Sequence, residues 1–288
     1  MSDRRTRLIL WTAIIPVLSF PVSICAAQHL DIKPKLSTSW QVDSNYYHAQ
    51  DLEREVYTYK LQPGIRIDFE TAKSNLMLDY TLDAYYYDDR DSVPPGEQPT
   101  DDDDFVGHTF TGEARYQAFD RLLVGLNGSS YKTRDPAESD IFSNSIAREK
   151  YIINQVTPIV VYDFGPKFTA RLQYRRTDID YSASNIEDSA ENRGLFNLVY
   201  NFTRRSSIDF EFQYWEKDYD AGTSDYSANQ AKLIFRKQLR IFEISAGAGY
   251  QNRSFDESGL DDIDVFTYNL NLDGEGTLSN RRTYISLN

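Results

Sequence analysis

Few residues in this chain have the types and spacing needed for acid–base or nucleophilic chemistry. Beyond residue 27 the histidines are His29, His48 and His108. Hydrolytic catalysis would need a histidine or serine held beside carboxylates. The carboxylates of residues 83–89 precede His108, so an acid–base group is one hypothesis, but no nucleophile–base spacing accompanies it. We therefore expect no enzyme and no catalytic residue.

The aspartate run at residues 101–104 is the one candidate for binding a cation. Carboxylate oxygens suit hard cations such as calcium or the ions that bridge lipopolysaccharide. The run lacks the ligand spacing and the glycine of an EF-hand, so a solvated acidic loop is the favoured interpretation. The single cysteine, Cys25, lies in a segment that we expect to be removed. No metal site, no disulfide and no cofactor are expected in the mature chain.

A larger set of charged side chains alternates with apolar ones and could line a water-filled path. The candidate lining residues are Lys60, Arg66, Asp79, Asp83, Glu113, Arg115, Arg171, Arg175, Asp209, Glu211, Arg236 and Glu243. Acids and bases are interspersed, and glutamines such as Gln173 lie among them, which suits polar solutes including sugars. The alternative is that these side chains neutralise one another and fill a narrow bore.

The segments that carry these residues have the period-two pattern of β-strands. Over residues 57–69 every second position is apolar, aromatic or proline, and polar residues lie between them. The alternation recurs in residues 76–86, 168–175, 208–214 and 242–250. Such runs are about ten residues long, whereas strands of soluble proteins usually have about five or six. The pattern predicts strands with lipid on one face and water on the other.

Pro63 and Pro158 each stand in the middle of an expected strand, where proline removes a ladder hydrogen bond. A local bulge at each proline is the simplest expectation.

Connections between the expected strands are alternately short and long. Short turns are expected near residues 71–75, 119–121, 164–167, 203–206, 237–240 and 279–282. Long polar loops are expected near residues 47–54, 88–104, 132–150, 178–193, 218–227 and 252–264. Transmembrane barrels show this alternation, with short turns in the periplasm and long loops outside the cell. The fold class predicted over residues 28–288 is all-β, a transmembrane antiparallel up-and-down β-barrel of at least twelve strands.

The two ends of the expected barrel differ in chemistry. The short turns carry bases: Lys73, Arg121, Lys167, Arg204, Arg205, Lys237, Arg240, Arg281 and Arg282. The long loops are acidic. Phenylalanines lie beside the short turns, namely Phe69, Phe119, Phe164, Phe202 and Phe242. Tyrosines lie toward the loops, namely Tyr46, Tyr47, Tyr57, Tyr86, Tyr131, Tyr151, Tyr214 and Tyr250. We expect these rings to form two girdles at the membrane interfaces.

The first 27 residues read as a targeting segment. Arg4, Arg5 and Arg7 precede the apolar residues 8–24, and Cys25-Ala26-Ala27 supplies small residues for cleavage. A retained helical anchor is the alternative, which the two prolines inside the apolar stretch disfavour. The whole chain is acidic, with a formal net charge of −13, so no nucleic-acid partner is expected. The expected location is the bacterial outer membrane, in contact with its lipid and lipopolysaccharide.

Four short motifs follow one another near the start of the mature chain: residues 36–40 (LSTSW), 43–47 (DSNYY), 61–65 (LQPGI) and 74–80 (SNLMLDY). Their order, a strand leading to a D-N type loop, a PG strand and a return through L-x-L-x-Y, resembles the β-barrel porin family found in exopolysaccharide gene clusters. The resemblance is clearest over residues 33–90 and recurs weakly at residues 279–283. It implies a barrel through which secreted polysaccharide or another polar solute crosses the outer membrane, and it supplies no catalytic residues.

Strand number leaves one expectation open. Twelve strands are complete, and residues 283–288 begin a thirteenth. A bacterial single-chain barrel needs an even number. We therefore expect either a chain that continues beyond Asn288 or an unusual pairing of its ends.

The function expected from these patterns is an outer-membrane pore or export channel for polar solutes, linked to exopolysaccharide secretion. Polysaccharide and a periplasmic export protein are the further partners that this function implies. The alternative is a non-conducting structural or adhesive barrel whose acidic loops make surface contacts.

Cleavage after Ala27 is the first testable prediction. The mature protein is expected in the outer membrane, with a new amino terminus at Gln28, because the basic, apolar and small-residue segments follow in the order of a signal peptide. Cell fractionation with amino-terminal sequencing checks this. Recovery of the protein from the soluble periplasm, or with its first 27 residues retained in the inner membrane, would contradict it.

Overall fold

The computed structural model describes residues 29–44, 55–90, 92–93, 100, 104–133, 150–182, 186–239, 242–257, 259–278 and 281–287. The expected signal segment lies outside these residues. Within the described part of the chain no helix is long and apolar enough to cross a membrane.

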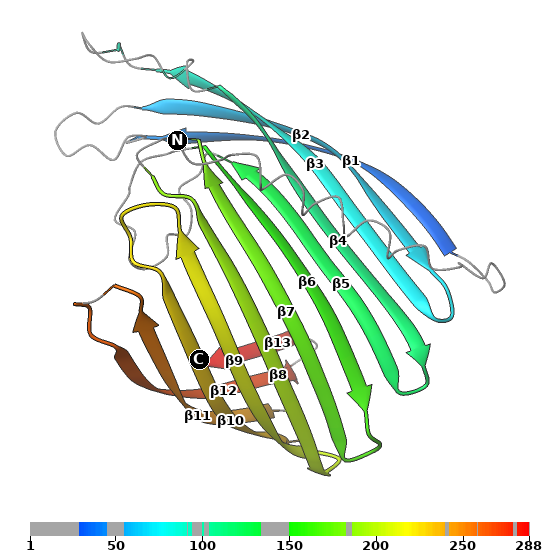
Figure 1. Ribbon diagram of the computed structural model, residues 1–288. Coiled ribbons are helices and arrows are strands. Elements are labelled where there is room, and N and C mark those ends of the chain that lie inside the picture. The colour runs from blue at the N-terminus through cyan, green and yellow to red at the C-terminus, as the bar shows by residue number, and fades with distance from the viewer. Residues whose placement is uncertain are drawn as a thin grey trace.

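The described residues form one antiparallel sheet in which each strand pairs with its neighbours in the sequence (Figure 1). The strands are β1 (His29–Asp43), β2 (Val56–Glu70), β3 (Ser74–Asp89), β4 (Phe105–Phe119), β5 (Leu122–Thr133), β6 (Tyr151–Asp163), β7 (Phe168–Tyr181), β8 (Ser189–Thr203), β9 (Ser206–Tyr219), β10 (Tyr226–Gln238), β11 (Phe242–Phe255), β12 (Ile263–Leu278) and β13 (Arg281–Leu287). The predicted all-β, antiparallel up-and-down order is confirmed, and so is the start of a thirteenth strand.

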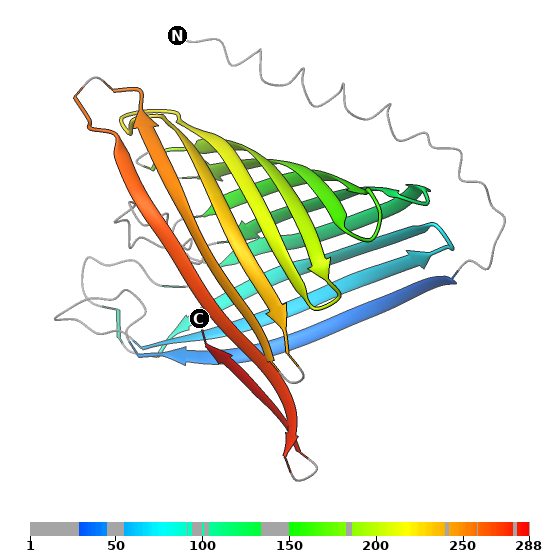
Figure 2. The same ribbon diagram turned by 90° about the horizontal axis from the view of Figure 1, so that it is seen from below.

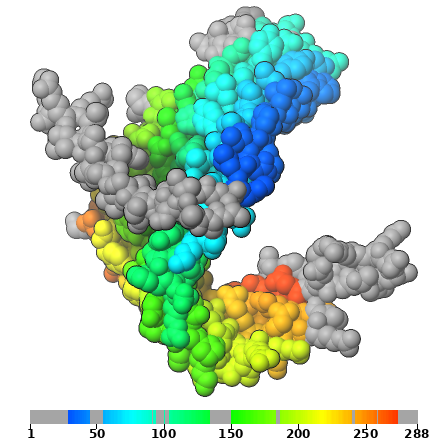
Figure 3. Space-filling model, turned by 90° about the vertical axis from the view of Figure 1, so that its right-hand side faces the viewer, coloured from blue at the N-terminus to red at the C-terminus, as the bar shows by residue number. Residues whose placement is uncertain are grey.

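The sheet has long strands and is strongly twisted and bent. Figure 2 shows the strands running side by side with a continuous twist, and Figure 3 shows the bend as a trough with the first and last strands on its two arms. In the strand order β1 and β13 are the two ends and are not paired with each other. The arrangement is that of a barrel wall, and closure of the wall stays a prediction.

The register between strands keeps apolar positions together. In β1 and β2, Ile32 lies opposite Ile67, and Ile67 lies opposite Leu78 of β3. The same phase continues to β9 and β10, where Phe210 lies opposite Leu233. A slip of one residue would reverse the facing of every side chain, so the pattern of alternation fixes the register. One continuous surface results, which we call the apolar face.

The apolar face is exposed rather than packed against protein. Leu36 is 72% exposed, Leu172 59% and Leu233 55%, and many other large apolar side chains on this surface are similarly open. Burying such side chains is the main stabilising term for a soluble fold, and large exposed apolar surfaces mark sites of contact with membranes or partners. The free energy of this surface is lower in contact with lipid than in contact with water.

The opposite surface, which we call the polar face, is more enclosed. Asp83 is 3% exposed, Asp209 5% and Thr157 3%. Side chains on a bent sheet converge on its concave side and spread apart on its convex side. The polar face is therefore the concave one, inside the trough.

The prolines in β2 and β6 do not produce bulges. Pairing between β2 and β3 is interrupted after Leu61 and resumes at Gly64 with unchanged register, and Pro158 interrupts the pairing of β6 and β7 in the same way. The expectation of local bulges was wrong, because the lost ladder hydrogen bond leaves a gap without a shift. The register does shift at Gln117–Phe119 and Asn201–Thr203, beside short turns.

The loops are shorter than the sequence pattern predicted at three places. β7 continues to Tyr181 and β8 begins at Ser189, although residues 178–193 were expected to form a loop. Loops at 218–227 and 252–264 are likewise shortened by strand ends at Tyr219, Phe255 and Ile263. At these strand ends the convex face becomes polar, with Asp180 and Ser227, while the concave face carries Tyr181 and Tyr226. The phase of the hydropathy pattern therefore changes there even though the ladder continues.

The facing of side chains gives a second testable prediction. Phe210 lies on the apolar face of β9 and is 40% exposed, whereas its neighbour Glu211 lies on the polar face. Phe210→Arg places a charge in lipid and is expected to cost about 2–4 kcal/mol of unfolding free energy. Glu211→Arg is the matched control and is expected to cost much less. Urea unfolding in lipid vesicles measures both, and equal costs would show that the strand phase is wrong.

Candidate functional site

The candidate site is the polar face, and all twelve predicted lining residues lie on it. Each of them belongs to the strand positions that alternate with the apolar face. Whether this face encloses a water-filled lumen stays a prediction.

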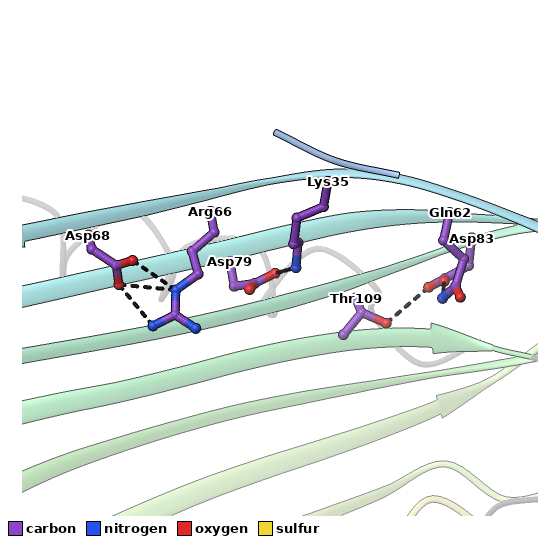
Figure 4. A network of polar contacts seen from close by, with 7 residues as sticks. All are labelled: Lys35, Gln62, Arg66, Asp68, Asp79, Asp83 and Thr109. Atoms are coloured by element: carbon purple, nitrogen blue, oxygen red, sulfur yellow. Dashed lines mark hydrogen bonds and ion pairs between the residues drawn. The ribbon is translucent and has the colours of Figure 1, made fainter. Parts of the chain in front are cut away.

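The β1–β4 part of this face carries a network of paired charges (Figure 4). Lys35 forms an ion pair with Asp79 across β1 and β3. Arg66 donates to Asp68 on its own strand, with 2.9 Å between Nε and Oδ2. Cations and carboxylates here balance one another within hydrogen-bond distance.

Asp83 is the buried centre of a second group in the same region. Its carboxylate accepts hydrogen bonds from the amide of Gln62 at 2.5 Å and from the hydroxyl of Thr109 at 3.0 Å. The ammonium of Lys60 lies 3.9 Å away. Gln62 stands next to Pro63, so this side-chain bond spans the gap that the proline leaves between β2 and β3.

Further along the sheet the remaining lining residues make smaller groups. Arg115 lies 3.2 Å from Glu113 and donates to Asn127 at 2.8 Å. Glu211 accepts a hydrogen bond from Gln213 at 2.8 Å. Arg171 donates to the neutral amide oxygen of Gln173 at 2.9 Å.

Arg236 lies between two carboxylates of different exposure. Its Nε donates to Asp209 at 2.6 Å, and its Nη1 lies 4.0 Å from Glu243. Asp209 also accepts a hydrogen bond from Ser207 at 3.1 Å. The side chain of Asp209 is 7% exposed and that of Glu243 is 44% exposed, so Asp209 is the carboxylate that is shielded from water.

Two charged residues of the polar face were not among the predicted lining residues, because they were assigned to a loop. Glu191 and Arg193 lie in β8 on the polar face. Glu191 accepts hydrogen bonds from Arg175 at 2.8 Å and from Arg193 at 3.0 Å. The guanidinium of Arg193 lies 4.4 Å from the ring centre of Trp215. The signal that could have found them is period-two spacing, because Glu191 and Arg193 stand four and two residues before Leu195 and so share its face.

At the long-loop end the polar face becomes aromatic. Tyr87, Phe105, Tyr151, Trp215 and Tyr226 are each less than 9% exposed there. Their rings meet those of neighbouring strands, as in the pair Tyr151–Tyr181 with 5.6 Å between centroids. Tyr131 and Tyr151 were predicted to belong to a membrane girdle, and this was wrong. Both lie on the polar face, since aromatic type alone does not report the facing of a side chain.

The other girdle residues lie on the apolar face where the prediction placed them. Near the short turns, Phe202 lies 6.1 Å from Phe235 between ring centroids. Near the loops, the hydroxyl of Tyr214 donates to Glu216 at 2.5 Å, and that of Tyr174 donates to Asn192 at 2.6 Å. Each tyrosine therefore has its ring beside the apolar band and its hydroxyl in a polar belt above it, as expected at a membrane interface. Tyr46 and Tyr47 lie outside the described residues.

The hypothetical acid–base group is not assembled. His108 lies on the apolar face, where its ring stacks on Tyr80 and its Nε2 lies 3.2 Å from the hydroxyl of Ser130. Asp83 is on the polar face, so the sheet separates the two side chains. Among the described residues no group of three or more His, Cys, Asp or Glu is placed to hold a metal ion. Residues 101–103 of the aspartate run lie outside the described residues, and Asp104 accepts a hydrogen bond from the amide of Tyr87 at 2.9 Å.

No protein-family model matches this chain, and no curated protein matches it. Among solved structures it is similar to OmpT, an outer membrane protein of Vibrio cholerae, with 9% identity and a TM-score of 0.48 over 92% of this chain and 100% of that one. It is also similar to the COG4313 outer membrane channel from Pseudomonas putida F1, with 13% identity and a TM-score of 0.40 over 90% of this chain and 94% of that one. The β domain of the Bordetella autotransporter BrkA gives 11% identity and a TM-score of 0.31 over 85% and 98%. At these values the likenesses assign no activity and no residue roles.

The two carboxylates of Arg236 give a third testable prediction. Asp209→Ala removes an enclosed, charge-assisted hydrogen bond and leaves the guanidinium without its nearer acceptor, so a loss of about 1.5–3 kcal/mol in unfolding free energy is expected. Glu243→Ala is the matched control on the same arginine and should cost less than about 1 kcal/mol, because its carboxylate is open to water. Urea unfolding in lipid vesicles compares them. Equal losses would contradict an enclosed polar face.

Proposed function

We propose that this chain is an outer-membrane β-barrel that forms a pore for polar solutes. The observation that carries the proposal is the contrast between the two faces of one continuous sheet. The apolar face is open over most of its area with large side chains, while the concave face is lined with ion pairs, amides and hydroxyls. Lipid on the convex side and water on the concave side satisfy both surfaces.

The orientation follows from the ends of the strands. On β7–β9 the apolar band of the convex face ends at Tyr174 and Tyr214, and the strands continue past it with polar residues such as Arg176 and Glu216 on that face. Barrels of bacterial outer membranes extend in this way on the side of their long loops, which is the cell surface. The basic short turns, such as the one with Lys73, then lie in the periplasm.

The mixed charge of the concave face supports passage of polar solutes rather than strong selection for one sign of ion. Most cations of β1–β4 lie beside a carboxylate, and amides such as Gln62 and Gln173 offer hydrogen bonds. A polysaccharide chain needs walls of this kind, without a field that would trap it. Export of exopolysaccharide, with a periplasmic export protein as partner, is the finer form of the proposal. Its support is the motif resemblance of residues 36–80, and glycosyltransferase genes beside this one would strengthen it.

A non-conducting barrel is the second candidate. The observation in its favour is the buried aromatic cluster at the long-loop end of the polar face, where Tyr87, Phe105 and Tyr226 occupy the same side as the proposed path. In that case the paired charges would serve to fill the interior, and the acidic loops would make contacts at the cell surface.

Conductance separates the two candidates and is the fourth testable prediction. The purified mature protein is expected to conduct in planar bilayers with weak ion selectivity. Arg171→Glu should shift the selectivity toward cations, because Arg171 bonds to a neutral amide and its reversal breaks no ion pair among the described residues. Lys73→Glu, the same charge change in a short turn, is the matched control and should shift selectivity less.

A protein that stays electrically silent, both intact and after removal of residues 88–104, would contradict the pore and favour the non-conducting barrel. Equal shifts from Arg171→Glu and Lys73→Glu would show that the polar face does not line the conducting path.

A further inference from the structure

The concave face carries an arginine pair whose charge is only half neutralised. Arg175 of β7 and Arg193 of β8 are directly opposite each other in the register. Like charges in directly opposed positions destabilise a sheet. One carboxylate, that of Glu191, serves both guanidinium groups. Two positive charges and one negative charge leave this position with an excess of one positive charge.

The hydrogen bonds show which arginine is satisfied. Arg193 binds both oxygens of Glu191, at 3.0 Å from Nε and 3.1 Å from Nη2, and it also donates to Gln213 at 3.3 Å. The ring of Trp215 lies against the same guanidinium. Among the described residues Arg175 makes a single bond to Glu191, at 2.8 Å, and its buried Nε has no hydrogen-bond partner. Arg193 is therefore held in place, while Arg175 has donors to spare.

A third cation extends the pair along β7. Arg171 lies on the same face as Arg175, four residues away, or about 13 Å along an extended strand. Gln173 lies between them and accepts the hydrogen bond of Arg171. The row of arginine, glutamine and arginine contrasts with β1–β4, where Lys35 lies beside Asp79 and Arg66 beside Asp68. The excess positive charge is thus local to β7 and β8.

We infer that Arg171, Arg175 and Arg193 form a binding site for the carboxylates of an acidic saccharide that passes through the pore. A guanidinium presents parallel N–H donors that match the two oxygens of a carboxylate. Gln173 and Gln213 provide the amides that sugar hydroxyls need. The site deepens the proposed function and rests on it, since it names the class of solute.

The position of the site supports this assignment. Arg175 lies between Tyr174 and Arg176, which are on the apolar face at the upper edge of the apolar band. The pair is thus at the mouth on the long-loop side. The side chains of Arg175 and Arg193 are 31% and 26% exposed, enough to meet a solute while the sheet partly excludes water. Charge-assisted bonds are strengthened in such surroundings.

Equilibrium binding to the purified mature protein tests the inference without requiring conductance. Trp215 is the reporter, in a Trp40→Phe background that removes the other tryptophan of the mature chain. Trigalacturonic acid is the probe, and maltotriose is its neutral counterpart. We expect the acid to change the fluorescence of Trp215 and to bind more tightly than maltotriose, with an affinity that falls as salt is added.

The variants are expected to change the affinity for trigalacturonic acid in opposite directions. Arg175→Gln should weaken trigalacturonic acid about tenfold or more, as expected for the loss of charge-assisted hydrogen bonds. Arg171→Gln should weaken it as well, and Glu191→Gln should strengthen it by removing the competing carboxylate. Arg176→Gln is the matched control, the adjacent arginine on the apolar face beside Asp178, and should leave binding unchanged. Migration of unheated samples on gels verifies folding, and Arg171→Gln and Glu191→Gln keep the test decisive if Arg175→Gln does not fold.

The inference is overturned if Arg175→Gln binds the acid as tightly as the parent, or if Arg176→Gln loses as much. It is also overturned if inorganic phosphate at equal ionic strength competes as well as trigalacturonic acid, since the site would then bind any anion. Binding without conductance would leave the site standing and remove the pore. Conductance without preferential binding of the acidic sugar would support the pore and overturn the proposed binding site.

Discussion

Backbone hydrogen bonding is the constraint on which this structure depends. A strand with lipid against one face cannot give its N–H and C=O groups to water on that side, so both must be paired with neighbouring strands. β2 shows the result: it is paired with β1 along its whole length and with β3 except at one proline. The ladder in turn imposes period two, and period two imposes two chemically different faces.

Because of that constraint, the residues of the concave face can vary without disrupting the fold. In the proposed barrel, lipid contact and the ladder stabilise the wall, so the polar face need not supply a hydrophobic core. The described residues show small buried apolar clusters such as Val56 with Tyr87 rather than one core. Its charges are instead satisfied locally, as Asp83 is by Gln62 and Thr109. An incompletely satisfied position such as Arg175 is therefore conspicuous, since the ladder does not require it.

The sequence alone predicted the strands wherever one face was apolar, as in residues 57–69, and with them the facing of all twelve lining residues. It failed at residues 178–193 because the apolar face becomes polar there, with Asp178, Asp180 and Asn192, so the phase of the hydropathy pattern changes while the ladder persists. The sequence alone also could not predict which polar side chains contact one another in the folded sheet. Spacing places Arg175 on a face, but only the register of β7 with β8 puts Arg193 opposite and Glu191 between them.

The polar strand ends connect these observations to the membrane. On the apolar face, Tyr174 and Tyr214 donate to Asn192 and Glu216, so in the proposed barrel the boundary between lipid and water would run across β7–β9 at this height. The arginine pair lies on the opposite face at the same height. In the proposed pore, a solute at this position would lie beside the water–lipid boundary, where part of its hydration must be exchanged for contacts with the wall. Donors with unmet hydrogen-bonding capacity are of most use there, because they replace the lost water at little cost in reorganisation.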